Sequence, residues 1–261
     1  MNRPMLQDPS PRSHGGGVQV SHVGKTYEVN GAALPVLDNI DFFVGEGEFV
    51  SIVGASGCGK STLLRLIAGL DLDFEGAISI DGQPVLGPSL DRGIVFQDHR
   101  LFPWLNVFDN IAMAFEARPI PAAKQRALIE EHIELVGLRG FEKAFPHQLS
   151  GGMAQRAAIA RALVNHPRMV LLDEPLGALD YFTRMRLQRE LQTIWMTKNV
   201  TMIFITHDID EALFMSDRIV VLKPNPGRIE RIVDIDLPRP RNRESPDFIA
   251  LRHEILEEFE V

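Results

Sequence analysis

Hydrophobic and polar positions follow two different periods along this chain, and the changes between them predict its secondary structure. Near-continuous apolar runs, typical of strands covered on both faces of a sheet, occupy 49–53, 169–172 and 201–205. Shorter or alternating segments predict further strands at 18–23, 36–44, 77–80, 93–96, 219–222 and 229–235. The alternation of Val18–Val23 is that of an edge strand, and Tyr27 follows it in a predicted loop.

Helical periodicity replaces the strand signals between about Asp98 and Pro167. Within this stretch 122–136 is amphipathic, and its apolar face carries Leu128, Ile129, Ile133 and Val136. We therefore predict a helical sub-domain, at about 98–167, inserted into an α/β core. Its dense apolar knot, Leu101–Leu105, belongs either to the core of that sub-domain or to an exposed pocket for a partner helix.

The two ends of the chain differ in composition from the core. Residues 1–17 are rich in Pro, Ser and Gly and predict a disordered arm. A proline-rich basic linker at 238–246 is followed by a predicted amphipathic helix whose apolar residues are Phe248, Leu251, Ile255, Leu256 and Phe259. The sequence thus divides into an arm at 1–17, a core at 18–237 and an extension at 238–261.

Length and charge narrow the class of protein. The 261 residues are 45% hydrophobic and 24% charged, which suits one sizeable α/β domain with a sub-domain. The net charge of −8 weighs against a protein that grips a nucleic-acid backbone. A single cysteine leaves no intramolecular disulfide and favours a reducing compartment. Because no apolar run approaches about 18 residues and no secretory leader is evident, we expect a cytosolic chain that reaches membranes through another polypeptide.

The stretch that follows the 49–53 strand carries the clearest chemistry. It has the pattern GxxxxGK[ST] and consists of Gly54, Ala55, Ser56, Gly57, Cys58, Gly59, Lys60, Ser61 and Thr62. A plain glycine turn is the alternative, but a strand before it and a helix after it favour a phosphate cradle. Lys60 is then placed for β- and γ-phosphates, and the Ser61 hydroxyl for Mg²⁺.

Polar side chains follow three of the other predicted strands. Asp173 and Glu174 end one buried run, at the sheet edge where ligands bind in α/β folds. Asp173 is a candidate holder of Mg²⁺, and Glu174 is placed to orient and deprotonate an attacking water. Gln97 is either a ligand of Mg²⁺ or water, or an ordinary loop amide. His207 either contacts a γ-phosphate or simply forms hydrogen bonds within its loop.

Three further residues or groups leave alternatives open. Ser150, Gly151 and Gly152 open a helix and form either a second anion site or a common N-cap. The Tyr27 ring either stacks on a base or covers the sheet edge. Cys58 lies at a helix N-terminus, where the pKa of a thiol tends to fall, so we predict that alkylation blocks the activity of the phosphate cradle and that a bound nucleotide protects the thiol.

Taken in order, these segments resemble the ATP-binding cassette (ABC) ATPases over Val18–Leu237. The matching motifs are Walker A at 54–62, the Q-loop residue Gln97, the signature at 149–156, Walker B at 169–173 with Glu174 as the catalytic carboxylate, the D-loop ending in Asp180, the switch residue His207 and the adenine-stacking position of Tyr27. Met153, Ala154 and Gly177 depart from commoner residues of these motifs.

The resemblance implies a P-loop NTPase core with a mixed sheet, an antiparallel β sub-domain and an inserted helical sub-domain. It also implies a head-to-tail dimer of two copies, with each ATP held between Walker A of one copy and Ser150, Gly151 and Gly152 of the other. Mg²⁺ would be held by Ser61, Gln97 and Asp173, and Asp180 would also lie at the nucleotide. Glu174 would polarise water while His207 bridges to the γ-phosphate.

Segments 96–105, 175–180 and 237–241 look like the nitrate, sulfonate and taurine importer group. That likeness implies a motor subunit at the cytoplasmic face of the cell membrane, bound to permease subunits and served by a solute-binding protein. The knot at Leu101–Leu105 would then form part of a groove for a permease helix. A soluble ATPase acting on nucleic acid or ribosomes is the alternative, which the acidic composition disfavours.

Overall fold

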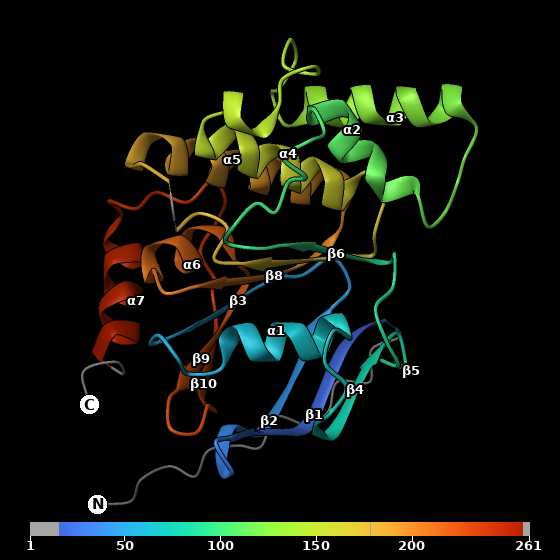
Figure 1. The fold of residues 1–261 in the computed structure, drawn as a ribbon. Coiled ribbons are helices and arrows are strands. Elements are labelled where there is room, and N and C mark those ends of the chain that lie inside the picture. Colours follow the sequence, from blue (N-terminus) through green and yellow to red (C-terminus); the bar gives the residue numbers. More distant parts are fainter. Residues whose placement is uncertain (1–15, 178, 258–261) are drawn as a thin grey trace, which may run out of the picture.

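A computed structural model describes residues 16–177 and 179–257. Six strands form the central sheet in the order β10-β9-β3-β8-β7-β6 (Figure 1). Their bounds are Arg228–Asp234 for β10, Arg218–Lys223 for β9, Phe49–Gly54 for β3, Thr201–Thr206 for β8, Met169–Asp173 for β7 and Arg92–Val95 for β6. All neighbours are parallel except β10, which is antiparallel to β9. The predicted buried strands are therefore confirmed.

A second, antiparallel sheet has the order β2-β1-β4-β5, with bounds Ala32–Gly45, Gly17–Val29, Glu75–Ile80 and Gln83–Pro84. The prediction of an edge strand at Val18–Val23 is wrong, because β1 lies between β2 and β4. One solvated face gives an inner antiparallel strand the same alternation as an edge. Tyr27 lies within β1 rather than in a loop, since the strand continues past the register shifts that interrupt its pattern.

Helix α1 (Lys60–Ala68) lies between the two sheets. Val50 and Ile52 of β3 face its apolar side chains, whereas Phe49 and Val53 point to the other face of the central sheet. This alternation explains why β3 reads as a continuous apolar run: both of its faces are covered. The helix ends at Gly69, whose φ of 75° is the left-handed C-cap that the sequence predicts.

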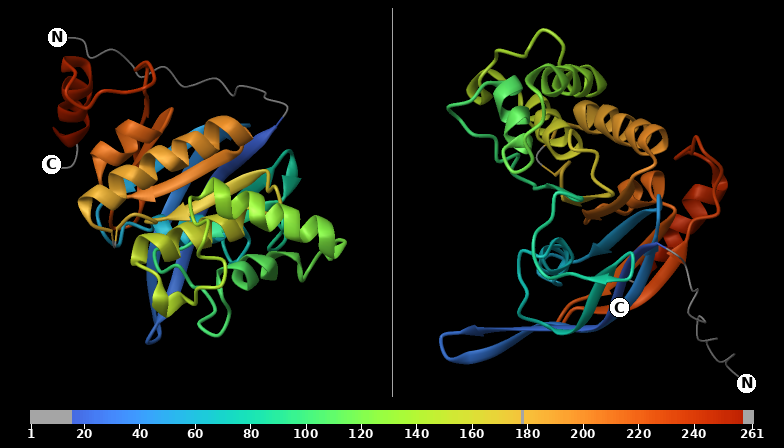
Figure 2. Two further views of the ribbon diagram at one scale, coloured as in Figure 1. Left: turned by 90° about the horizontal axis from the view of Figure 1, so that it is seen from above. Right: turned by 90° about the vertical axis from the view of Figure 1, so that its right-hand side faces the viewer.

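Helices α4 (Gly151–Leu163), α5 (Tyr181–Lys198) and α6 (Ile209–Met215) cover the opposite face (Figure 2). Outside them lie α2 (Val107–Ala112), α3 (Ala122–Leu135) and short 3₁₀ turns at Met113–Phe115 and Pro146–Gln148. Among the described residues, 98–167 contain no strand, as predicted. Gly93 lets α4 approach β6 closely, because a Cβ there would lie 2.7 Å from the Ala162 carbonyl oxygen.

The apolar knot at 101–105 is partly buried and partly exposed, and its role toward a partner helix stays a prediction. Leu101 is buried in the main core, whereas the Trp104 side chain is 70% exposed. Asn110 fixes the loop between them, accepting from the Phe102 amide at 2.8 Å and donating to the Leu105 carbonyl at 2.9 Å. These hydrogen bonds fix the loop in a conformation that leaves Trp104 exposed to solvent.

The C-terminal extension packs onto the core and ends in α7 (Pro246–Glu257), which buries Phe248 and Ile255. Arg241 is buried and donates to the carbonyls of Leu213 and Ser216 at the end of α6. These bonds satisfy carbonyls that a helix leaves free at its C-terminus. Phe259 and the arm at 1–15 lie outside the described residues, while Gly17 begins β1. Across 16–177 and 179–257, no helix is long and apolar enough to cross a membrane.

Candidate nucleotide-binding site

The phosphate loop runs from the end of β3 to the start of α1 and depends on glycine at two turns. Gly57 and Gly59 have φ of 81° and 95°, values that residues with a Cβ rarely adopt. Gly54 is required for a different reason, since a Cβ there would lie 2.6 Å from the Leu222 carbonyl oxygen of β9. Within 16–177 and 179–257, no side chain forms a capping hydrogen bond at the start of α1. The first amides of the helix are thus available to an anion.

Lys60 is buried inside this loop. Its Nζ donates to the carbonyls of Gly54 at 2.9 Å and Ala55 at 3.1 Å, and lies 3.8 Å from Glu174 Oε1. The ammonium group therefore already sits between the loop and the acidic end of β7. A cation in this position is suited to the β- and γ-phosphates of a bound nucleotide.

Ser61 and Asp173 meet beside the loop, where Ser61 Oγ donates to Asp173 Oδ1 at 2.8 Å. Burial raises the pKa of Asp173, although the bond from Ser61 lowers it. A hydroxyl and a carboxylate oxygen are the hard ligands that Mg²⁺ prefers, so the donor set fits that ion. Gln97 lies farther along the edge, in a cavity of about 340 Å³ that it shares with Gly151 and Leu179.

Glu174 and His207 come from the ends of the neighbouring parallel strands β7 and β8. His207 Nδ1 lies 3.3 Å from Glu174 Oε2. The Glu174 backbone has a φ of 44°, a strained value for a residue other than glycine, and its amide donates to the Ile205 carbonyl at 3.0 Å. The strained turn directs the carboxylate toward the switch histidine and Lys60, an arrangement suited to positioning a water molecule.

Ser150 caps α4 through a 3.3 Å bond from the Met153 amide to its Oγ. Gly151 has open space where a Cβ would stand, while Gly152 packs tightly, with a Cβ placed 2.4 Å from Thr183 Cγ2 of α5. Helices α1 and α4 lie on opposite faces of the central sheet. Among the described residues, Ser150 forms its side-chain hydrogen bond within its own helix rather than with the phosphate loop.

Tyr27 and Asp180 occupy the outer parts of the predicted site. The Tyr27 hydroxyl donates to Asp71 Oδ2 at 3.3 Å, and Lys25 Nζ lies 4.7 Å from the ring centroid. Asp180 Oδ1 caps α5 by accepting from the Thr183 amide at 3.1 Å, and hydrogen bonds from the Thr183 side chain and amide lower the pKa of Asp180. Both contacts hold the side chains in place, and their roles toward nucleotide stay predictions.

Cys58 corrects one expectation. The thiol is buried, and burial raises its pKa despite the opposing influence of Lys60. The helix N-terminus therefore does not make this cysteine acidic, because loss of water around the thiolate is the larger effect.

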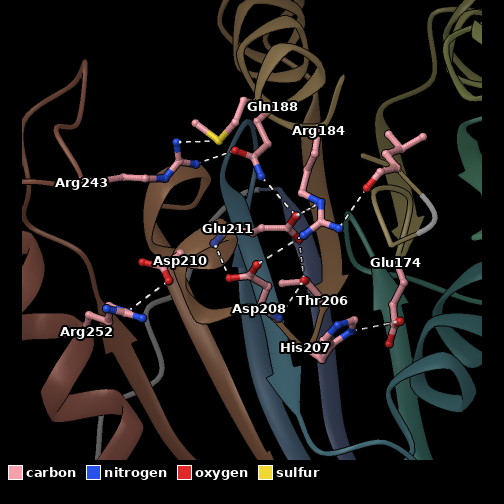
Figure 3. A network of polar contacts seen from close by, with 12 residues as sticks. Glu174, Arg184, Gln188, Thr206, His207, Asp208, Asp210, Glu211, Arg243 and Arg252 are labelled. Atoms are coloured by element: carbon pink, nitrogen blue, oxygen red, sulfur yellow. Dashed lines mark hydrogen bonds and ion pairs between the residues drawn. The ribbon is translucent and has the colours of Figure 1, made fainter. Parts of the chain in front are cut away.

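Sequence reasoning missed two groups that support the site. The first is Gly227, in the turn between β9 and β10, whose backbone packs directly against the phosphate loop. A Cβ on this residue would lie 2.2 Å from the Cys58 carbonyl oxygen. The Pro-Asn-Pro-Gly run at 224–227 marks a turn but gives no sign of that contact. The second group is a polar network around Glu211 and Arg184 (Figure 3), which involves residues that no motif had singled out.

Comparison with known proteins places this geometry in a family. The family model described as ABC transporter matches residues 37–177, which include the phosphate loop, Gln97, Ser150 and both carboxylates of β7. The chain belongs to this family. Its membership confirms the P-loop fold class and the assignment of ATP hydrolysis to this cassette.

Similar proteins include ATP-binding proteins of import and transport systems. The aliphatic sulfonates import ATP-binding protein SsuB of Bacillus cereus is 49% identical over 243 residues, covering 93% of this chain and 96% of that protein. The bicarbonate transport ATP-binding protein CmpC of Synechococcus elongatus is 48% identical over 247 residues, 92% of this chain and 37% of that protein. The dimeric post-hydrolysis state of an ATP-binding cassette with ADP and Pi has a TM-score of 0.74 and 34% identity, over 84% of this chain and 98% of that chain.

Proposed function

We propose that this cassette ATPase drives a membrane importer of small organic anions of the sulfonate class. The observation that carries the proposal is near-full-length identity of 49% to an aliphatic sulfonate import subunit. The intact set of phosphate loop, carboxylates and histidine supports the hydrolytic part of the role. A bicarbonate transport subunit is almost as similar, so the chemistry common to both is uptake of a small anion.

ATP is bound between two copies in this proposal. Lys60 and the amides that begin α1 hold the phosphates from one side, and Ser150 with Gly151 and Gly152 of the second copy holds them from the other. The placement of α1 and α4 on opposite faces of the sheet supports this division, and so does the dimeric form of the related cassette. Asp180 would lie beside the second-copy contact, because it caps α5 and Thr183 in the first turn of that helix packs against Gly152.

Ser61, Asp173 and Gln97 would hold Mg²⁺, which supplies charge neutralisation for the phosphates when bound. Glu174 accepts a proton from the attacking water, and His207 keeps that carboxylate aimed while contacting the γ-phosphate. The 3.3 Å separation of His207 Nδ1 and Glu174 Oε2 supports this pairing. Lys60 lies at the same sheet edge as these two side chains. The cation that binds phosphate and the carboxylate that accepts the proton are therefore close together.

The proposed partners follow from the importer role: a second copy of this chain, permease subunits and, indirectly, a solute-binding protein. The subunit would act at the cytoplasmic face of the membrane. Trp104, exposed and rigidly held beside the buried Leu101, supports the groove for a permease helix at 101–105.

The test is to isolate the permease and solute-binding protein that co-purify with this chain and to reconstitute the three together. In proteoliposomes, ethanesulfonate should stimulate ATP hydrolysis about tenfold and be taken up with ATP present. Lys60→Ala, assembled in the same complex, is the matched control and should bind the permease without supporting uptake. Stimulation by bicarbonate alone would reject the sulfonate assignment. Hydrolysis that neither solute nor permease changes would reject the importer role.

A further inference from the structure

A polar network joins the turn before α5 to the turn that carries His207 (Figure 3). Arg184, on the first turn of α5, donates from Nη2 to the Leu179 carbonyl at 3.1 Å. The same guanidinium faces two acidic side chains beyond His207: its Nε lies 3.7 Å from Glu211 Oε1 and its Nη1 lies 3.9 Å from Asp208 Oδ2. One side chain therefore contacts both turns.

Glu211 carries the connection onward to the switch histidine. Its side chain is only 7% exposed, and Oε2 accepts from Thr206 Oγ1 at 2.7 Å. Thr206 Oγ1 in turn accepts from the Asp208 amide at 3.0 Å, and Asp208 Oδ1 accepts from the Glu211 amide at 3.2 Å. His207 is the residue between these two anchors. Its backbone is thus fixed on both sides by Glu211, whose remaining oxygen accepts from Gln188 Nε2 at 3.1 Å.

The other end of the network reaches the second-copy contact. Gly152, at the start of α4, packs against Thr183, the residue before Arg184. A Cβ on Gly152 would also lie 3.8 Å from Leu179 Cδ2, so the start of α4 lies next to the Leu179 side chain. In the proposed dimer, Ser150–Gly152 grip the ATP that is held by the second copy. A shift there would act first on Thr183 and Leu179, and Arg184 binds the Leu179 carbonyl.

We propose that Arg184 is a positioning residue that couples the two ATP sites of the dimer. It transmits the state of Ser150–Gly152, which face the ATP of the second copy, to His207, which faces the ATP of its own copy. This inference rests on the proposed function for the dimer, but the link from Leu179 through Arg184 to Thr206 lies within one chain. The network that surrounds Glu211 makes the link stiff, because its oxygens are buried and bonded.

Amide hydrogen exchange on the full chain tests the link without dimer or permease. Arg184→Gln should speed exchange at the amides of 206–211 by about tenfold or more while leaving the phosphate loop unchanged. Coupling is reciprocal, so Thr206→Val, which removes the bond to Glu211, should speed exchange at 177–184. Thr206→Ser keeps the hydroxyl and should restore protection there.

Arg186→Gln is the matched control, since it removes the same charge from an exposed residue of the same helix, whose ion pair among the described residues is with Glu190. It should change neither segment. In ATPase assays, Arg184→Gln should lower kcat about tenfold while KM for ATP stays within about twofold, because the phosphate loop is untouched. The coupling role is overturned if exchange increases only at the sequence neighbours of each mutated residue. It is also overturned if KM for ATP rises while kcat is unchanged. If the wild-type protein hydrolyses ATP but supports no sulfonate uptake, the importer proposal is rejected. The coupling role of Arg184 is unaffected by that result.

Discussion

Ser61 Oγ and Asp173 Oδ1 form a 2.8 Å hydrogen bond although 112 positions separate the two residues. One belongs to the first turn of α1 and the other to the end of β7. Burial raises the pKa of Asp173, so its ionised form is held at some cost to the fold. A carboxylate placed where it is energetically unfavourable is typical of a site retained for chemistry rather than stability.

Asp173→Asn should therefore separate activity from stability. The amide oxygen still accepts from Ser61, but the charge that would hold Mg²⁺ is lost. We expect kcat to fall about 100-fold or more, while a gain of about 1 kcal/mol would raise Tm by about 2–4 °C. Steady-state ATPase assays and thermal unfolding measure the two effects. A variant that is both less stable and fully active would contradict this account of the site.

Gly227→Ala should weaken nucleotide binding from outside the phosphate loop. The added Cβ would lie 2.2 Å from the Cys58 carbonyl oxygen and 2.9 Å from that of Val36, and backbone cannot step aside as a side chain can. We expect a loss of about 1–3 kcal/mol in stability and a KM for ATP about tenfold higher. Gly87→Ala is the control, because its Cβ would meet nothing within 4 Å. Equal behaviour of the two variants would remove Gly227 from this supporting role.

The single thiol should react slowly in the native state. Burial raises the pKa of Cys58, so little thiolate is present near neutral pH. We expect reaction with a disulfide reagent at pH 7.5 to be about 100-fold slower than in urea, and to accelerate as pH rises. All of the signal comes from one residue, since the chain has one cysteine. Native labelling as fast as that of a free thiol would mean that the loop opens readily.

The parts of the fold that could be predicted are those encoded by local pattern. The run 169–172 is apolar because both faces of β7 are covered, and its first polar residue, Asp173, marks the sheet edge. The GxxxxGK[ST] motif identifies the phosphate loop from the sequence, so no structural information is needed for that assignment. The prediction of a loop at Tyr27 is wrong because register shifts interrupt the alternation of apolar and polar residues in the second half of β1.

What could not be predicted depends on contacts between distant segments. Gly227 reads as an ordinary turn residue, and only the packing of that turn beneath Cys58 gives it a role. Cys58 itself has the local surroundings of an acidic thiol, yet burial by distant segments reverses the direction of its pKa shift. Arg184 looks like a solvent-facing residue of a polar helix until α6 is placed beside it.

Asp81→Asn should make stability less sensitive to acid. The Gly17 amide donates to Asp81 Oδ1 at 2.8 Å, and this bond, together with Arg168, lowers the pKa of the carboxyl group. A lowered pKa stabilises the fold above the unfolded value of about 3.9 and loses that contribution as pH falls through the folded pKa. We expect the variant to lose about 1 kcal/mol at pH 7 and almost nothing near pH 2. Urea unfolding at both pH values, with the exposed Asp236→Asn as control, measures this; an equal loss at both would point to packing instead.

Glu174→Gln should trap the nucleotide-bound state. The amide keeps the shape that places Oε2 3.3 Å from His207 Nδ1 but cannot accept a proton from water. We expect kcat to fall about 100-fold or more while the Kd for ATP stays within about twofold, because Lys60 and the loop glycines are unchanged. Dimers should therefore accumulate with ATP in sedimentation experiments. Glu130→Gln, on the exposed face of α3, is the control for loss of a carboxylate. Near-normal turnover in Glu174→Gln would assign the base to another group, and loss of ATP binding would show that this carboxylate instead holds Lys60 in place.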